Sequence, residues 1–108
     1  MLPTIRAIAQ QATVTADNLD QMVAAAKTPA DHEAIAAFYE QEAADAKKKA
    51  ALHRNTADTY KKLKISKPVG MVRMCKGIAA MWDKIAEDLE NLANMHREMA
   101  KTASSKSD

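Results

Sequence analysis

The sequence has few of the residues that break helices or build sheets. It contains two glycines, three prolines and one cysteine in 108 residues, and aromatic side chains make up 4% of it. A single cysteine excludes a disulfide within the chain, and the scarcity of β-branched and aromatic residues argues against a sheet. No apolar run reaches the roughly 18 residues of a membrane-spanning helix. The formal net charge of +2 does not indicate a nucleic-acid partner.

The abundant residue is alanine, at 23 positions, and this composition predicts an all-α protein. Helical spacing of apolar residues predicts a helical segment over 4–27 and two long helices over 29–62 and 68–102. The polar residues 104–108 predict a disordered tail. The two long helices are joined by a short turn, so we expect a long antiparallel hairpin.

Local signals place the helix starts. Thr28, Pro29 and Asp31 supply a capping hydroxyl, a proline for the first helical position and a carboxylate three residues after the cap. The first segment is weaker, and Thr15 or Asp17 could cap a new start within it. Residues 1–103 then form one domain. Two helices cannot cover both faces of the hairpin, so the N-terminal segment, homodimerisation or both should complete a three- or four-helix bundle.

The two long helices align with each other when the chain is shifted by 43 residues. Residues 32–57 match residues 75–100 at nine of 26 positions, which suggests an internal repeat or two amphipathic helices with convergent patterns. The predicted apolar seams of the hairpin are Ile35, Tyr39, Ala43, Ala46, Ala50 and His53, facing Ile78, Trp82, Ile85, Leu89, Leu92 and His96. All three histidines and the cysteine fall on corresponding positions: His32 with Cys75, and His53 with His96.

The spacing of these four residues predicts two pairs. Within each helix they are 21 residues apart, which is three heptads and therefore one face. In an antiparallel hairpin, His32 should lie near His96, and His53 near Cys75. Five of the seven methionines lie between 71 and 99, and four of them stand close to these positions: Met71, Met74, Met95 and Met99. Imidazole, thiolate and thioether donors together select soft ions such as Cu(I) or Ag(I).

The leading hypothesis is therefore non-enzymatic binding of copper or another late transition metal by His32, His53, Cys75, His96 and the four methionines. The rival is a structural or protein-interaction module in which histidine only sets register and methionine fills gaps. A third reading is a redox protein, either with non-covalent haem, as in small helical-bundle cytochromes, or with Cys75 as a reactive thiol beside His53. No small-molecule substrate is indicated. No Glu-x-x-His motif supports a di-iron site, and no Cys-x-x-Cys-His motif supports covalent haem.

Two sequence stretches carry a resemblance to known proteins: AAKTPADHEAIAAFYE at residues 25–40 and KAALHR at residues 49–54. They resemble a group of small, uncharacterised bacterial helical proteins that are often exported, and the resemblance covers residues 20–100. The second repeat of that group begins with a His-Cys pair, whereas Met74 and Cys75 stand here. Residues 1–6 lack the apolar core of a signal peptide, which fits a cytosolic protein or a mature exported one. The resemblance favours the exported, periplasmic form.

Overall fold

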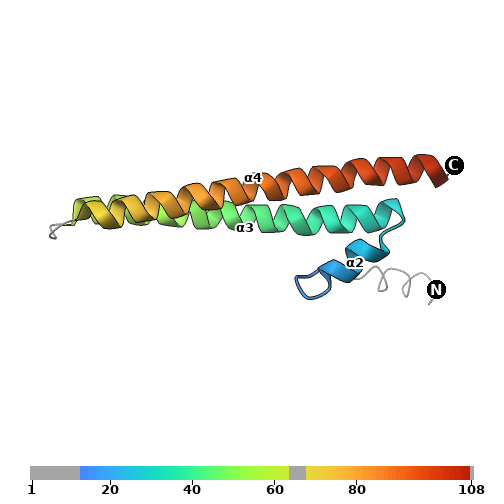
Figure 1. Cartoon of the computed structure of the whole chain (residues 1–108), viewed down its shortest axis with the longest axis horizontal. Coiled ribbons are helices and arrows are strands. Elements are labelled where there is room, and N and C mark those ends of the chain that lie inside the picture. Colours follow the sequence, from blue (N-terminus) through green and yellow to red (C-terminus); the bar gives the residue numbers. More distant parts are fainter. Residues whose placement is uncertain (1–12, 64–67, 108) are drawn as a thin grey trace, which may run out of the picture. The chain divides into compact units, whose positions relative to one another are not determined.

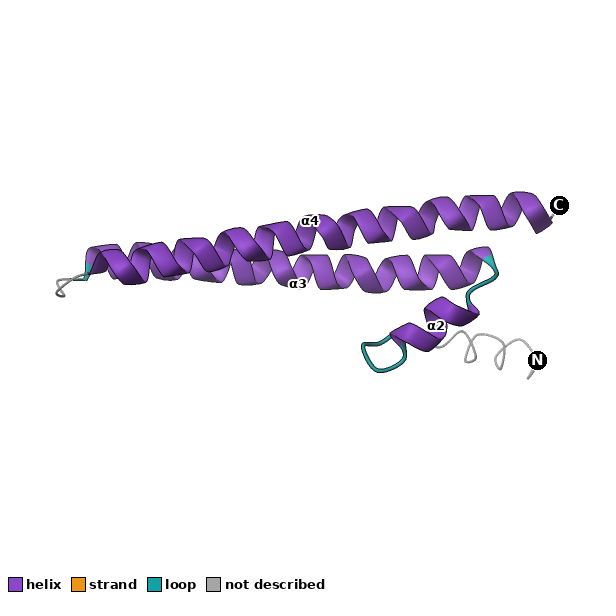
Figure 2. Ribbon diagram, viewed as in Figure 1, coloured by secondary structure: helices purple, strands orange, loops and turns teal. Residues whose placement is uncertain are grey.

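The described part of the chain is entirely helical and loop. The computed structural model describes residues 13–63 and 68–107, and these ranges contain three helices and no strand (Figure 1, Figure 2). The helices are α2 Leu19–Ala25, α3 Pro29–Lys62 and α4 Pro68–Ser107. The all-α class and the packed pair of long helices are confirmed, and no fourth helix occurs in the described ranges. None of these helices is both long and apolar enough to cross a membrane.

The helix boundaries agree with the sequence for α3 and differ for the other two helices. α4 continues to Ser107, so the prediction that it ends at 102 and that a disordered tail begins at 104 was wrong for residues 104–107. The N-cap of α2 is Asn18, without a side-chain capping bond, and neither Thr15 nor Asp17 takes that role. Thr15 and Asn18 instead bond each other's backbone N–H groups in the turn before α2. Residues 1–12 of the predicted N-terminal segment lie outside the described residues.

The start of α3 is fixed by a reciprocal cap. The Thr28 hydroxyl oxygen accepts the Asp31 N–H at 3.1 Å, and the Asp31 carboxylate accepts the N–H groups of Lys27 at 2.9 Å and Thr28 at 3.1 Å. These two backbone donors lower the pKa of Asp31, because they stabilise its charged form. The cap holds the first turn of α3, and therefore the position of His32 directly after it.

The chain divides into two compact units. One consists of Met1–Tyr39 and Leu92–Asp108, and the other of Glu40–Asn91. The first unit contains α2, the beginning of α3 and the end of α4. The second contains the remainder of α3 and the beginning of α4. In each unit the two long helices run antiparallel (Figure 1).

Alanine forms most of the buried surface of the helix pair. The buried alanines of the second unit are Ala43, Ala46, Ala50 and Ala57 on α3 and Ala79 and Ala86 on α4, and those of the first are Ala36, Ala93 and Ala100. On each helix most of them recur every seven residues, which is the heptad spacing of a coiled-coil seam. Small side chains let two helix backbones approach closely.

The predicted apolar seam of α4 was wrong in part. Ile85 and Leu92 are 41% and 38% exposed, while Ala86 and Ala93 are buried. One residue along a helix is a rotation of about 100°, so the packed face of α4 is turned away from Ile85 and Leu92. His96 is buried as expected, and Trp82 and Leu89 are half-buried. The close alanine contact leaves no room for branched residues at those positions.

Polar pairs beside the alanine seam fix the antiparallel register within each unit. In the second unit Lys47 lies 2.6 Å from Glu90, and Arg54 pairs with Asp83. In the first unit Arg97 lies 3.5 Å from Glu33. These pairs are largely exposed to solvent and each stabilises the fold by about 1 kcal/mol or less. Their main effect is to align α3 with α4, because each pair joins a defined position of one helix to a defined position of the other.

Candidate functional site

Two histidines meet across α3 and α4 in the first unit. The Nδ1 atoms of His32 and His96 are 3.2 Å apart, and their rings are stacked with centroids 5.4 Å apart. The predicted proximity of these two residues is confirmed. At this separation one imidazole donates its Nδ1–H to the Nδ1 of the other, so at least one of them is neutral.

The surroundings of His96 keep it neutral. It is 8% exposed, and the Tyr39 ring lies against it with centroids 5.8 Å apart. Burial lowers the pKa of His96, because the charged imidazolium loses its water, and the charge of His32 when protonated lowers it further. Near neutral pH His96 therefore presents an unprotonated ring nitrogen. Such a nitrogen can accept a hydrogen bond or bind a metal ion through its lone pair.

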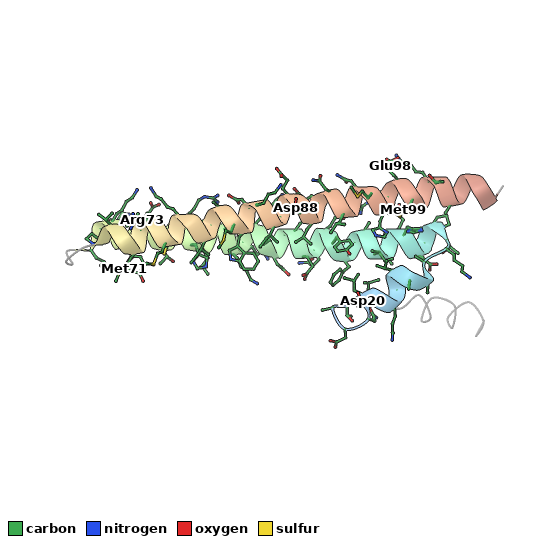
Figure 3. The ribbon with its side chains drawn as sticks, in the orientation of Figure 1. Asp20, Met71, Arg73, Asp88, Glu98 and Met99 are labelled. Carbon is green, nitrogen blue, oxygen red and sulfur yellow. The ribbon has the colours of Figure 1, made fainter. Side chains whose placement is uncertain are left out.

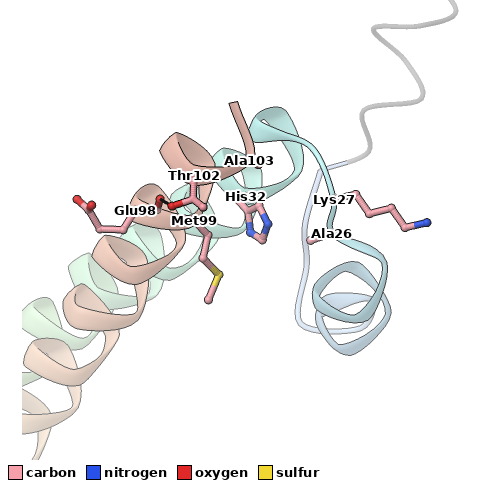
Figure 4. A pocket seen from close by; sticks show the side chains of 7 residues that line it. All are labelled: Ala26, Lys27, His32, Glu98, Met99, Thr102 and Ala103. Atoms are coloured by element: carbon pink, nitrogen blue, oxygen red, sulfur yellow. Dashed lines mark hydrogen bonds between the residues drawn. The ribbon is translucent and has the colours of Figure 1, made fainter. Parts of the chain in front are cut away.

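An open pocket of about 500 Å³ lies beside the pair (Figure 4). It is lined by Ala26, Lys27, His32, Glu98, Met99, Thr102 and Ala103. The chain before α3, the start of α3 and the last turns of α4 thus all contribute to its wall. His32 gives it an imidazole and Met99 a thioether, while Lys27 and Glu98 place one charge of each sign at its edge. Through His32, which lines it, the pocket connects the histidine pair to solvent.

The other predicted ligands are not assembled into one site. Met95 belongs to the first unit and is 58% exposed, and it does not line the pocket. The second unit holds four more of the predicted ligands. His53 and Cys75 are half-buried, and Met71 and Met74 are exposed. No hydrogen bond joins His53 to Cys75 in the described part of the chain, and the proximity of these two stays a prediction. Nor do the described residues contain any group of three or more His, Cys, Asp or Glu side chains placed to hold a metal.

Sequence reasoning identified the histidine pair but missed its surroundings. Tyr39 was placed on the packed seam without a role beside His96. Its signal was available, since Tyr39 follows His32 by seven residues and so occupies the same face of α3. The sequence gave no signal for Lys27 or Thr102, because neither residue falls on a predicted apolar seam. Their positions at the pocket depend on where the chain enters α3 and on how far α4 extends.

Comparisons with protein-family models, with curated proteins and with solved structures find no match to this chain. The site must therefore be interpreted from its own geometry.

Acidification is expected to destabilise the protein between about pH 6.5 and the lowered pKa of His96. In this range the unfolded chain takes up a proton that native His96 resists, so the stability present above pH 6.5 is lost as the pH falls. One proton limits this slope to about 1.4 kcal/mol per pH unit. Thermal unfolding followed by circular dichroism at successive pH values measures it. The variant His96→Gln should have a shallower slope in this range, and an unchanged slope would contradict the assignment.

Proposed function

We propose that this protein is a non-enzymatic metal-binding protein that holds a soft late transition metal ion, Cu(I) or Ag(I), between His32 and His96. The observation that carries the proposal is the 3.2 Å separation of their Nδ1 atoms. Metal–imidazole bonds of about 2.0–2.1 Å at tetrahedral angles hold two nitrogens about 3.3 Å apart. Because the rings are stacked and each lone pair lies in the plane of its ring, both rings must rotate to direct their lone pairs at one ion, which then takes the place of the shared proton.

Met99 supports the choice of a soft ion. Its side chain lines the same pocket as His32, and it follows His96 by three residues on α4, which is about one helical turn. Thioether donors favour Cu(I), whereas Zn²⁺ sites in proteins are built from cysteine, histidine and carboxylate ligands. Two imidazoles and one thioether leave a coordination position open toward the pocket. An open position fits a protein that accepts and releases its ion better than one that keeps it for structure.

Titration with Cu(I) under reducing conditions, in competition with a chromogenic chelator, tests the proposal. We expect one tight site per chain, with affinity lowered at least about tenfold in His32→Ala and in His96→Ala. Met99→Leu keeps the size and apolar character of the side chain but removes the sulfur, and it should lower the affinity for Cu(I). His53→Ala and Met81→Leu are matched controls and should leave the affinity unchanged.

A structural role for the histidine pair is the second candidate, and one observation favours it. The pair is already hydrogen-bonded, and no buried side-chain nitrogen or oxygen among the described residues lacks a partner. If the purified protein binds no Cu(I) or Ag(I) while His96→Gln lowers its melting temperature, the pair serves the fold alone. A visible Soret band in the purified protein would instead indicate haem. Each result overturns metal binding as the function of this pair.

A further inference from the structure

Two open pockets share a wall in the second unit, where α3 ends and α4 begins. Their volumes are about 380 and 390 Å³, in the range of small-molecule sites. Lys61 of α3 and Lys76 of α4 line both pockets, and Arg73, which lines the first, is labelled near the start of α4 in Figure 3. The other lining residues are Pro68, Val69 and Val72 in the first pocket and Arg54 and Asp58 in the second.

Helical spacing gathers these side chains on two walls. On α4, the lining positions 69, 72, 73 and 76 follow the spacing i, i+3, i+4 and i+7, which is one face of a helix. On α3, positions 54, 58 and 61 follow the same rule. Within this unit the helices run antiparallel, so the last turns of α3 lie beside the first turns of α4. Each helix therefore supplies one wall.

Positive charge is in excess where the pockets meet. Among the described residues, no ion pair includes Lys61, Arg73 or Lys76. The lining of the first pocket contains no carboxylate, and that of the second contains one, Asp58. Arg54 is already held by a carboxylate of α4. Three cationic side chains thus stand around the shared wall without a matching anion.

Lys61 and Lys76 are close enough to affect each other's charge. A hydrogen bond donated by the Lys61 ammonium, together with the repulsion between the two charges, lowers the pKa of Lys76, and the Asp58 carboxylate opposes this effect only in part. Two like charges held together disfavour the doubly charged state. An anion bound between them restores that state, so the pair is suited to binding an anion.

We propose that these pockets bind a phosphate monoester that carries a small apolar group, with the phosphate between Lys61, Arg73 and Lys76 and the apolar group against Val69 and Val72. A phosphate monoester carries about 1.5 to 2 negative charges near pH 7 and three strong acceptor oxygens. The arginine fork can pair with two of these oxygens, and each lysine supplies a point charge. This site is in a different unit from the histidine pair and does not depend on metal binding.

The first turn of α4 supports both halves of this ligand. Val69 is 70% exposed and Val72 is half-buried, so the first pocket has an apolar wall directly beside its cations. An apolar group placed there leaves water, which favours an organic phosphate over inorganic phosphate. The first turn is also the positive end of the α4 macrodipole, and this adds to the attraction of the three cations for an anion.

NMR titrations with phenyl phosphate, inorganic phosphate and phenol, at fixed ionic strength, test the proposal. We expect phenyl phosphate to bind at least about threefold more tightly than inorganic phosphate, and phenol to bind most weakly. Lys76→Gln should lower the affinity for phenyl phosphate at least about fivefold. Lys62→Gln is the matched control, because it removes the same charge from an exposed side chain that lines neither pocket. No binding of phenyl phosphate, or an equal effect of the two substitutions, would overturn the site.

The apolar wall is tested separately. Val69→Ser should lower the affinity for phenyl phosphate about threefold and leave that for inorganic phosphate unchanged. Met74→Ser is the control, since Met74 is 68% exposed and lines neither pocket. Equal affinities of the wild-type chain for phenyl phosphate, inorganic phosphate and sulfate would show an adventitious ion only and overturn the proposal. His32→Ala should leave phosphate binding unchanged, which separates this site from metal binding.

Discussion

Replacing Ile35 with alanine is expected to lower the free energy of unfolding by about 2–4 kcal/mol. Ile35 is fully buried, and it is the largest such side chain in the described chain. Its removal forfeits the transfer of three carbons from water and leaves a cavity that surrounding side chains fill only in part. Chemical denaturation monitored by circular dichroism at fixed protein concentration measures the loss, and a melting temperature lower by about 4–8 °C per kcal/mol should accompany it.

Leu52→Ala is the control for this substitution. It removes a similar volume from a side chain that is 58% exposed on the same helix. Little transfer energy is lost there, and no cavity forms, so the expected change is within about 0.5 kcal/mol. Similar losses for the two variants would show that the burial of Ile35 contributes little to stability.

Enlarging the alanine seam is expected to have the second-largest effect. Ala50 is fully buried in the seam between α3 and α4 of the second unit. A leucine at this position must force the helices apart or adopt a strained rotamer, and we expect a loss of about 1–3 kcal/mol. Ala51→Leu is the matched control, because Ala51 is exposed on the same turn and leucine is nearly as good a helix former as alanine. If both leucines were tolerated equally, the close packing of the seam would be contradicted.

The sequence predicted the long helices because their signals are local. The Thr28–Asp31 cap and Pro29 act through neighbouring backbone groups, and they place the start of α3 regardless of what packs on it. The end of α4 had no comparable signal. Ser104 and the polar residues after it lower helix propensity only slightly, and a helix already extended over many turns continues at little cost.

Ile85 and Leu92 were wrongly placed on the packed face of α4 because two neighbouring stripes share the same heptad spacing. Hydrophobicity favours Ile85 and Leu92 for burial, and both are large enough to dominate any sequence pattern. Alanine gains less from burial, but its size permits close contact along the whole seam. Sequence periodicity shows that α4 has a packed face, and it does not show which of two neighbouring stripes meets α3.

The His32–His96 pair could be predicted from the sequence, whereas the proximity of His53 to Cys75 remains a prediction. His32 directly follows the capped start of α3, which the sequence places well. The 21-residue spacing within each helix and antiparallel packing predicted both pairs, and a contact is observed for His32 with His96. Cys75 and His32 differ in size and hydrogen bonding, so corresponding sequence positions need not give corresponding contacts.

The alanine seam by itself does not distinguish the observed alignment of the two long helices from alignments displaced by seven residues. A displacement of one heptad places alanine on alanine again, with nearly the same close contact. What distinguishes the observed alignment is the set of cross-helix pairs. These are His32–His96 with Tyr39 and Glu33–Arg97 in one unit, and Lys47–Glu90 and Arg54–Asp83 in the other. The residues that form the candidate site thereby also reject the neighbouring alignments of the hairpin.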